Sequence, residues 1–253
     1  MKSASRKENL SVPVPASGKC LIRAVNGSIR CVGGDVDEIQ VEATYTARGH
    51  SIEEARENVE QIRIDHVDNQ GTAEIRAVVP NGIQGGVTML VTMPPALSLD
   101  LQTKNGVIGV ENIQGDVLAQ TSNGGVGIVN VAGTIEAKSS NGKIVIEGDL
   151  LTRVNAITSN GAVTLAGQLA PGDHSIQTSN GTVEVDLRGG SADVTARTSN
   201  GKIYANGKVV KADSPFRLGD RNAEPAARMS IKTSNGSVRT TFVAAVSDVA
   251  EGI

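Results

Sequence analysis

The sequence predicts an all-β protein built as a β-solenoid, of the parallel β-helix or β-roll type, with about 18–20 residues in each coil. Three observations predict this fold: a regular Asn-Gly spacing, alternating apolar residues beside each Asn-Gly, and a scarcity of aromatic residues. Successive Asn-Gly pairs from Asn105 to Asn200 are 18, 18, 19, 20 and 20 residues apart, and a step of 35 leads to Asn235. A unit near twenty residues is too short to bury its own core, so we expect the units to stack.

Most of these pairs belong to a four-residue motif, Thr-Ser-Asn-Gly, which we interpret as the structural turn of each coil. The predicted turn residues are Asn105, Gly106, Asn123, Gly124, Asn141, Gly142, Asn160, Gly161, Asn180, Gly181, Asn200, Gly201, Asn235 and Gly236. Asn26-Gly27 is an earlier, weaker copy. We expect Gly142 and Gly161 to need positive φ, which glycine adopts without strain.

Apolar pairs with a period of two flank each turn and predict two short strands per repeat. One pair lies two and four positions beyond the Gly, as in Ile108 and Val110. Another lies four and six positions before the Asn, as in Leu99 and Leu101. Asn-Gly is also a strong hairpin signal, so an antiparallel meander is the alternative. The preceding Thr-Ser favours stacked coils, because identical residues above one another can form ladders.

The composition indicates a narrow core. The 253 residues include 29 Gly, no Trp, two Phe and two Tyr. The interior must therefore be filled by Val, Ile, Leu and Ala.

The first hundred residues predict a cap on this stack. We expect a flexible N-terminus at 1–11, a first coil and capping region at 12–95, solenoid repeats at 96–242 and a C-terminal tail at 243–253. Ser51 to Glu54 forms a capping box, which with the apolar residues after it predicts one short amphipathic helix. Further strands are expected up to the Pro94-Pro95 pair.

The order of a Gly-rich first coil, a Ser-initiated helix, a strand ending in Val91-Thr92-Met93-Pro94 and then Thr-Ser-Asn-Gly coils resembles one bacterial family. It is similar to the putative adhesin family known as domain of unknown function 4097, from about residue 12 to residue 242. The resemblance implies a bacterial β-solenoid, exported or tethered at the cell envelope, with no established enzymatic activity. The adhesin label of that family is itself an inference from architecture.

One feature departs from that family's usual context. Met1 to Leu10 is charged and polar, and the chain has no run of 18 apolar residues, so the sequence predicts neither a signal peptide nor membrane insertion. Localisation stays open between the cell envelope or extracellular space, as the resemblance implies, and the cytoplasm.

A net charge of −3 provides no basic field, so nucleic acid is not expected as a partner. Few aromatic side chains are present to stack on bases or sugars, and Tyr45 and Tyr204 are the two tyrosines that could do so.

The residues that could carry chemistry are scattered. Cys20 and Cys31 flank one turn at inward positions, and the sequence leaves open a disulfide or two buried free thiols. His50, His66 and His174 are far apart in sequence, and we expect all three to be solvated. Zinc would require more Cys or His nearby, so no metal or cofactor is predicted.

A polysaccharide-active β-helix enzyme would need acidic residues clustered on one strand face. Glu184 with Asp186 is the nearest approach to such a cluster, and the alternating outward positions of a solvated strand explain it better. The sequence therefore favours a non-enzymatic surface module, a putative adhesin or structural protein. An intracellular polymer-forming scaffold, whose solenoid ends self-associate, is the alternative, and a hydrolase is third.

The long step before Asn235 contains a segment, 208–228, that we expect to form a loop. Its Phe216, Leu218 and Arg221 are candidates for binding an unknown surface or protein partner. The other interpretation is that this loop covers the C-terminal end of the core.

Overall fold

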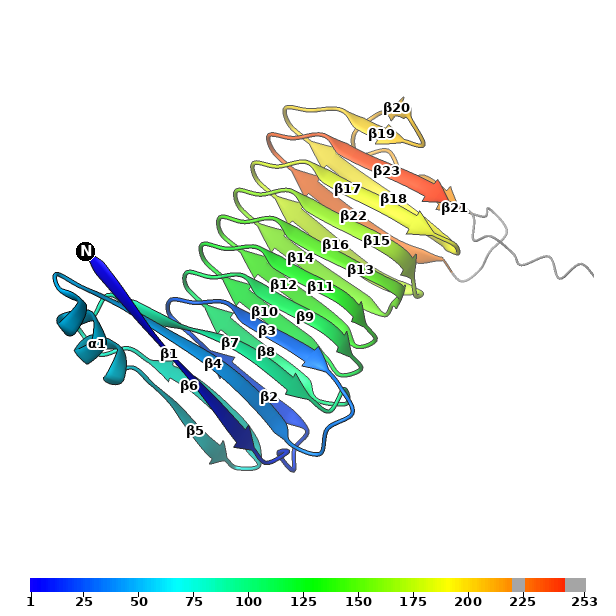
Figure 1. Cartoon of the computed structure of the whole chain (residues 1–253). Coiled ribbons are helices and arrows are strands. Elements are labelled where there is room, and N and C mark those ends of the chain that lie inside the picture. Colours follow the sequence, from blue (N-terminus) through cyan, green and yellow to red (C-terminus); the bar gives the residue numbers. More distant parts are fainter. Residues whose placement is uncertain (220–225, 244–253) are drawn as a thin grey trace, which may run out of the picture.

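The protein is described by a computed structural model over residues 1–219 and 226–243. Over these residues the chain is all-β with one α-helix, and its strands form two long sheets that pack face to face as in a β-solenoid (Figure 1). Sheet A contains, in spatial order, β1 (Lys2–Val12), β4 (Ile39–Gly49), β7 (Gly85–Met93), β3 (Ile29–Gly33), β9 (Ile108–Ile113), β11 (Val126–Val131), β13 (Ile144–Leu151), β15 (Val163–Leu169), β17 (Val183–Arg188), β23 (Val238–Val243), β19 (Ile203–Ala205) and β20 (Lys208–Val210). Sheet B contains β21 (Phe216–Gly219), β18 (Ser191–Thr198), β22 (Ala227–Thr233), β16 (Gly172–Thr178), β14 (Arg153–Thr158), β12 (Thr134–Ser139), β10 (Val117–Thr121), β8 (Ser98–Thr103), β2 (Lys19–Arg23), β6 (Thr72–Val78) and β5 (Arg63–Asn69).

Strand pairing in the middle of both sheets is parallel, which excludes the antiparallel meander. β8, β10, β12, β14 and β16 pair in parallel in sheet B, and β9, β11, β13, β15 and β17 do so in sheet A. Each Asn-Gly turn therefore carries the chain from a strand of sheet B to a strand of sheet A. A parallel neighbour is reached only after a full circuit, which is why the repeat is about twenty residues long.

The core lies between the sheets and consists of one cluster of alternating apolar residues. Ile108, Val126, Ile144 and Val163 lie in register across four strands of sheet A, and each is at most 1% exposed. Sheet B contributes both small and large residues to the same cluster: Ala119, in register with Ala137 and Ala156, is fully buried, and Val117 is 1% exposed. Side chains of both sizes fill a thin, two-layered interior.

The first and last coils do not stack in sequence order. The coil of β2 and β3 lies between β6–β7 and β8–β9. The coil of β22 and β23 lies between β16–β17 and β18–β19. These two coils are thus built into the stack beneath an outer coil, whereas β1, which begins the chain, lies at the outer edge of sheet A.

The N-terminal end is closed by antiparallel strands and the helix. The predicted helix and its Ser cap are confirmed: α1 (Ile52–Glu60) begins after Ser51, whose side chain accepts a hydrogen bond of 3.1 Å from the Glu54 amide. The Glu54 carboxylate in turn accepts from the backbone amide of His50, one residue before the expected partner, at 2.6 Å. Residues 1–11, expected to be flexible, instead belong largely to β1, which pairs antiparallel with β4 over its full length. Their polar alternation is that of an edge strand with one solvated face, a pattern that composition alone obscures.

The C-terminal segment 208–228, expected to be a loop, contains β20, β21 and the start of β22. β20 pairs antiparallel with β19 at the C-terminal edge of sheet A, and β21 pairs antiparallel with β18 at the C-terminal edge of sheet B. Residues 244–253, most of the expected tail, lie outside the described residues.

Candidate binding surface

The Asn-Gly turns line up along one edge of the stack and join their side chains into a ladder. In spatial order the members are Asn26, Asn105, Asn123, Asn141, Asn160, Asn180, Asn235 and Asn200. Each amide Nδ2 donates to the Oδ1 of the preceding Asn at 2.7–2.9 Å. Seven hydrogen bonds run unbroken across the swapped coil order, so the ladder follows space and not sequence.

A second ladder explains the Thr of the motif. The Thr158 hydroxyl donates to the Gly142 carbonyl of the preceding coil at 3.0 Å, and Thr178 does the same to Gly161 at 2.9 Å. The equivalent bonds elsewhere are made by Thr103, Thr121, Ser139, Thr233 and Thr198. A hairpin would give these hydroxyls no such partner.

The turn glycines are required for a reason other than the one we predicted. Neither Gly142 nor Gly161 has positive φ. A Cβ added to Gly161 would lie 2.0 Å from the Gly142 carbonyl oxygen, and one added to Gly142 would lie 1.9 Å from that of Gly124. Close approach of successive backbones excludes a side chain here, as in other tightly stacked chains.

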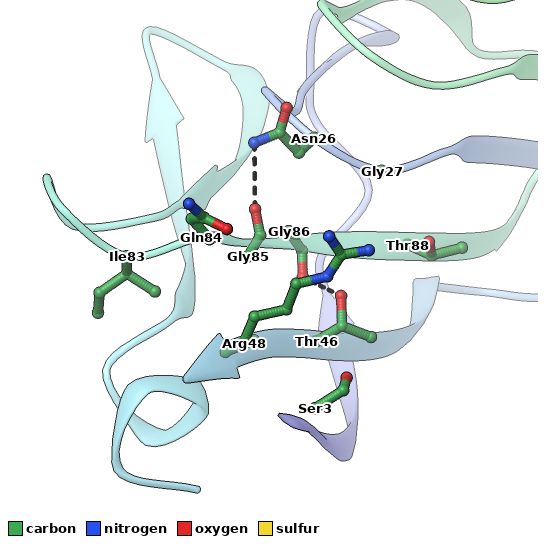
Figure 2. Close-up of a pocket in the computed structure, with 11 residues that line it drawn as sticks. Ser3, Asn26, Gly27, Thr46, Arg48, Ile83, Gln84, Gly85, Gly86 and Thr88 are labelled. Atoms are coloured by element: carbon green, nitrogen blue, oxygen red, sulfur yellow. Dashed lines mark hydrogen bonds between the residues drawn. The ribbon is translucent and has the colours of Figure 1, made fainter. Parts of the chain in front are cut away.

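A polar pocket lies where the Asn ladder meets the N-terminal cap (Figure 2). Its volume is about 630 Å³, and its walls come from β1, β4, β7 and the turn at Asn26 and Gly27. The Asn26 amide donates to the Gly85 carbonyl at 3.1 Å, which ends the ladder on this side. The Thr46 hydroxyl bonds to the Gly86 carbonyl at 3.5 Å.

The floor of this pocket is fixed by backbone packing. A Cβ added to Gly86 would lie 2.0 Å from the Asn26 carbonyl oxygen, and one added to Gly27 would lie 2.0 Å from that of Val87. Gly27 also has φ of +135°, a conformation that glycine adopts readily. These residues are therefore held in place by the neighbouring backbones.

The candidate partner-binding residues of segment 208–228 are placed as follows. Leu218 lies in β21 and is 1% exposed within the core. Phe216 is half-buried and packs against the same core. Arg221 lies outside the described residues. The structure thus brings Phe216 and Leu218 to the C-terminal edge of sheet B.

Cys20 and Cys31 are free and fully buried. Burial raises the pKa of the Cys20 thiol to about 12 and, with Cys20 nearby, raises that of Cys31 well above its usual value. Neither thiol is suited to nucleophilic chemistry, which requires the thiolate.

His174 is not solvated, contrary to our prediction, whereas His50 and His66 are exposed. It is 2% exposed, its Nε2 lies 2.9 Å from the Ala170 carbonyl, and its buried Nδ1 has no hydrogen-bond partner in the described structure. Burial lowers the pKa of His174. The sequence contained a signal for this burial: His174 lies six residues before Asn180, the position that buried Leu99 and Val117 occupy relative to Asn105 and Asn123.

Tyr45 cannot stack on a sugar, because it is fully buried beneath the Arg6 guanidinium, 4.0 Å from its ring centre. Burial, with Glu8 as the next cause, raises the pKa of Tyr45 to about 12.

Glu184 and Asp186 do not form an acidic cluster with free carboxylates. Glu184 pairs with Arg239 at 3.7 Å, and Asp186 accepts a hydrogen bond from Thr241. Both partners lie on β23, so these acids hold the inserted C-terminal coil. Over residues 1–219 and 226–243, no group of three or more His, Cys, Asp or Glu is placed to bind a metal.

No protein-family model and no curated protein matches the sequence. Solved structures do resemble it. A putative adhesin from Bacteroides fragilis NCTC 9343 is 11% identical, with a TM-score of 0.54, over 96% of this chain and 97% of that one. A putative lipid binding protein from Parabacteroides distasonis ATCC 8503 is 12% identical, with a TM-score of 0.44, over 94% and 96% of the two chains.

A putative cell adhesion protein from Clostridium sporogenes ATCC 15579 is 11% identical, with a TM-score of 0.38, over 95% of this chain and 100% of that one. At these identities the likeness shows the fold alone, and the Bacteroides structure is similar enough to support that statement. In the described parts of the chain, no helix has the length and apolar character needed to cross a membrane.

Proposed function

We propose that this protein is a non-enzymatic β-solenoid module that serves as an adhesive or structural surface of a bacterial cell envelope. The observation that carries the proposal is the continuous Asn ladder, which makes one edge of the stack a long, repeated and exposed polar surface. A surface with a repeat set by strand spacing suits a ligand that is itself repetitive, such as a polysaccharide. The fold-level likeness to a putative adhesin is consistent with this role.

We further propose that different parts of the chain have different structural roles. Residues 12–95 would supply the first coil and cap, and residues 96–242 the repeated body. The Asn-Gly turns would be structural, because their side chains and backbones are engaged in contacts between coils. Phe216 and Leu218 would cover the C-terminal end of the core, because Leu218 is buried there; Arg221 remains a candidate partner contact.

The structure also bears on the polymer-forming alternative. Stacking of ends would require open parallel coils, whereas antiparallel strands β1, β5, β20 and β21 cover the ends of both sheets. Charged side chains on an edge strand, such as Lys2, Lys7 and Glu8 on β1, are one way in which sheet proteins avoid edge-to-edge association. The surface role is therefore the better supported of the two.

The proposal is tested by binding to envelope material. Beads coated with the folded chain should retain purified bacterial envelope polysaccharide, whereas beads coated with a protein of similar net charge and unrelated fold should not. In the native organism, gold-labelled antibodies should mark the envelope. Labelling of filaments inside the cell, without retention of envelope material by the beads, would support the polymer-forming scaffold instead.

A further inference from the structure

The pocket at the end of the Asn ladder contains a positive charge with no carboxylate beside it. Arg48 lines this pocket and makes no ion pair with any described residue, and no Asp or Glu is among the lining residues. Several other arginines of the stack are paired, such as Arg6 with Glu8, Arg30 with Glu111 and Arg228 with Asp173, at 2.7–2.9 Å. In a chain with net charge −3, an unpaired guanidinium in a pocket provides a local site for an anion.

The remaining lining groups are neutral and suited to hydroxyl groups. Ser3, Thr46 and Thr88 contribute hydroxyls, and Gln84 contributes a carboxamide, around the Arg48 guanidinium (Figure 2). Each of these groups can both donate and accept hydrogen bonds. The pocket volume of about 630 Å³ falls within the range of small-molecule sites, roughly 300–1,000 Å³.

One cation and several neutral polar groups line the pocket, and this combination indicates which class of anion fits it. A phosphate near neutral pH carries close to two negative charges and is usually held by several cations or a row of amides. A carboxylate carries one charge and matches the fork of a single guanidinium. A uronic acid residue combines one carboxylate with several hydroxyls.

We propose that this pocket binds a carboxylate-bearing sugar residue of an acidic polysaccharide, with Arg48 pairing the carboxylate. Ser3, Thr46, Thr88 and Gln84 contact the sugar hydroxyls. Because Gly86 and Gly27 fix the floor, binding requires little reorganisation of the backbone. The inference rests on the proposed adhesive function and names the chemical class of its ligand.

The test uses the full chain and two trisaccharides of equal length, one of galacturonic acid and one of galactose, in calorimetric titrations at low salt. The folded chain is expected to bind the acidic trisaccharide at least about tenfold more tightly than the neutral one. Arg48→Gln should lose about tenfold or more in affinity for the acidic sugar, as expected when a charge-assisted hydrogen bond is removed. Arg153→Gln is the matched control, because Arg153 is also exposed and without an ion pair but lies on sheet B.

Three results would overturn the inference: no binding of the acidic trisaccharide, equal binding by Arg48→Gln and the parent, or tighter binding of inorganic phosphate. Circular dichroism melts of both variants should match the parent, since both side chains are exposed. Retention of envelope material by beads coated with Arg48→Gln, at the parent level, would leave the adhesive function standing and place its binding surface elsewhere. If beads coated with the parent, with Arg48→Gln or with Arg153→Gln all fail to retain envelope material, the adhesive function itself is contradicted.

Discussion

Gly161→Ala should be among the most destabilising small substitutions in the stack. The new Cβ would lie 2.0 Å from the Gly142 oxygen, 2.5 Å from the Gly142 carbon and 3.1 Å from the Lys143 nitrogen. Non-bonded carbon atoms are at their optimum near 3.5–4.0 Å, so the two coils must separate by roughly 1.5 Å at this turn. Backbone atoms cannot rotate out of the way as a flexible side chain would.

That separation would break the hydrogen bonds that join the two coils at the turn. They are Thr158 to the Gly142 carbonyl at 3.0 Å, the Asn160 side chain to Asn141 at 2.9 Å and the Asn160 amide to the Ser140 carbonyl at 2.8 Å. At about 1 kcal/mol each, their loss would cost about 3 kcal/mol. Replacing Gly by Ala restricts the unfolded chain and returns about 0.4–1 kcal/mol. The net cost is therefore expected to be about 2–3 kcal/mol.

Gly127→Ala is the matched control, because Gly127 lies in β11, has no positive φ and leaves its Cβ position with nothing within 4 Å. It should be neutral or stabilising by about 0.4–1 kcal/mol. Gly172→Ala should fall between the two: the space is open, but its φ of +140° is strained for alanine, at about 1–2 kcal/mol. Urea midpoints followed by circular dichroism give the order. If Gly161→Ala and Gly127→Ala unfold at the same urea concentration, close backbone approach does not explain the turn glycines.

Three further predictions address modularity, pH and the thiols. Deleting Asn123–Ser140 removes one whole coil and should leave a folded, slightly less stable protein by circular dichroism, whereas deleting Asn123–Val131 removes only β11 and should unfold it. Burial lowers the pKa of His174, so as the pH falls the unfolded chain binds a proton at this histidine before the folded protein does, and the free energy of unfolding should fall below the ordinary histidine pKa of 6.5. His174→Phe should reduce this pH dependence in urea titrations. An unchanged pH dependence in the variant would exclude the histidine as its origin. Cys20 and Cys31 should both resist iodoacetamide in the native protein and react after unfolding, as counted by mass spectrometry; absence of reaction with unfolded, unreduced protein would reveal a disulfide.

The strands and their faces could be predicted because alternation is a local property. Ile108 and Val110, two and four positions after Gly106, are both fully buried as the period of two requires. Ser51 marked the start of α1 for the same reason, since a capping box is contained within four residues.

Features that depend on contacts between distant coils were harder to predict. The need for glycine at Gly142 and Gly161 arises from the carbonyl of the previous coil, which no local pattern reveals. The Arg48 pocket was missed because its walls come from four separate parts of the chain. β1 was missed because an edge strand needs only a few inward-facing apolar groups, and its polar residues resembled a flexible terminus.

The spatial order of the coils is the feature that the sequence leaves least determined. Every coil except that of Asn26 presents the same turn, a Thr or Ser hydroxyl two residues before the Asn and a parallel edge, so any of these coils can in principle stack on any other. The step of 35 residues was therefore interpreted as a loop in an ordered stack. Ion pairs of Asp173 with Arg228 and of Glu184 with Arg239 join the last coil to β16 and β17, but these side chains are exposed, so the pairs contribute little to the choice of order.

This order predicts an unusual response to truncation. Removing the chain from residue 226 onward deletes β22 and β23, and so removes an inner layer on which β18 and β19 rest. We expect residues 191–219 to lose protection from hydrogen exchange, while β8 to β15 keep theirs, because contacts in such stacks extend only to neighbouring coils. In a stack built in sequence order, the same truncation would remove only the last coil and leave 191–219 protected. Full protection of 191–219 in the truncated protein would contradict the inserted position of the C-terminal coil.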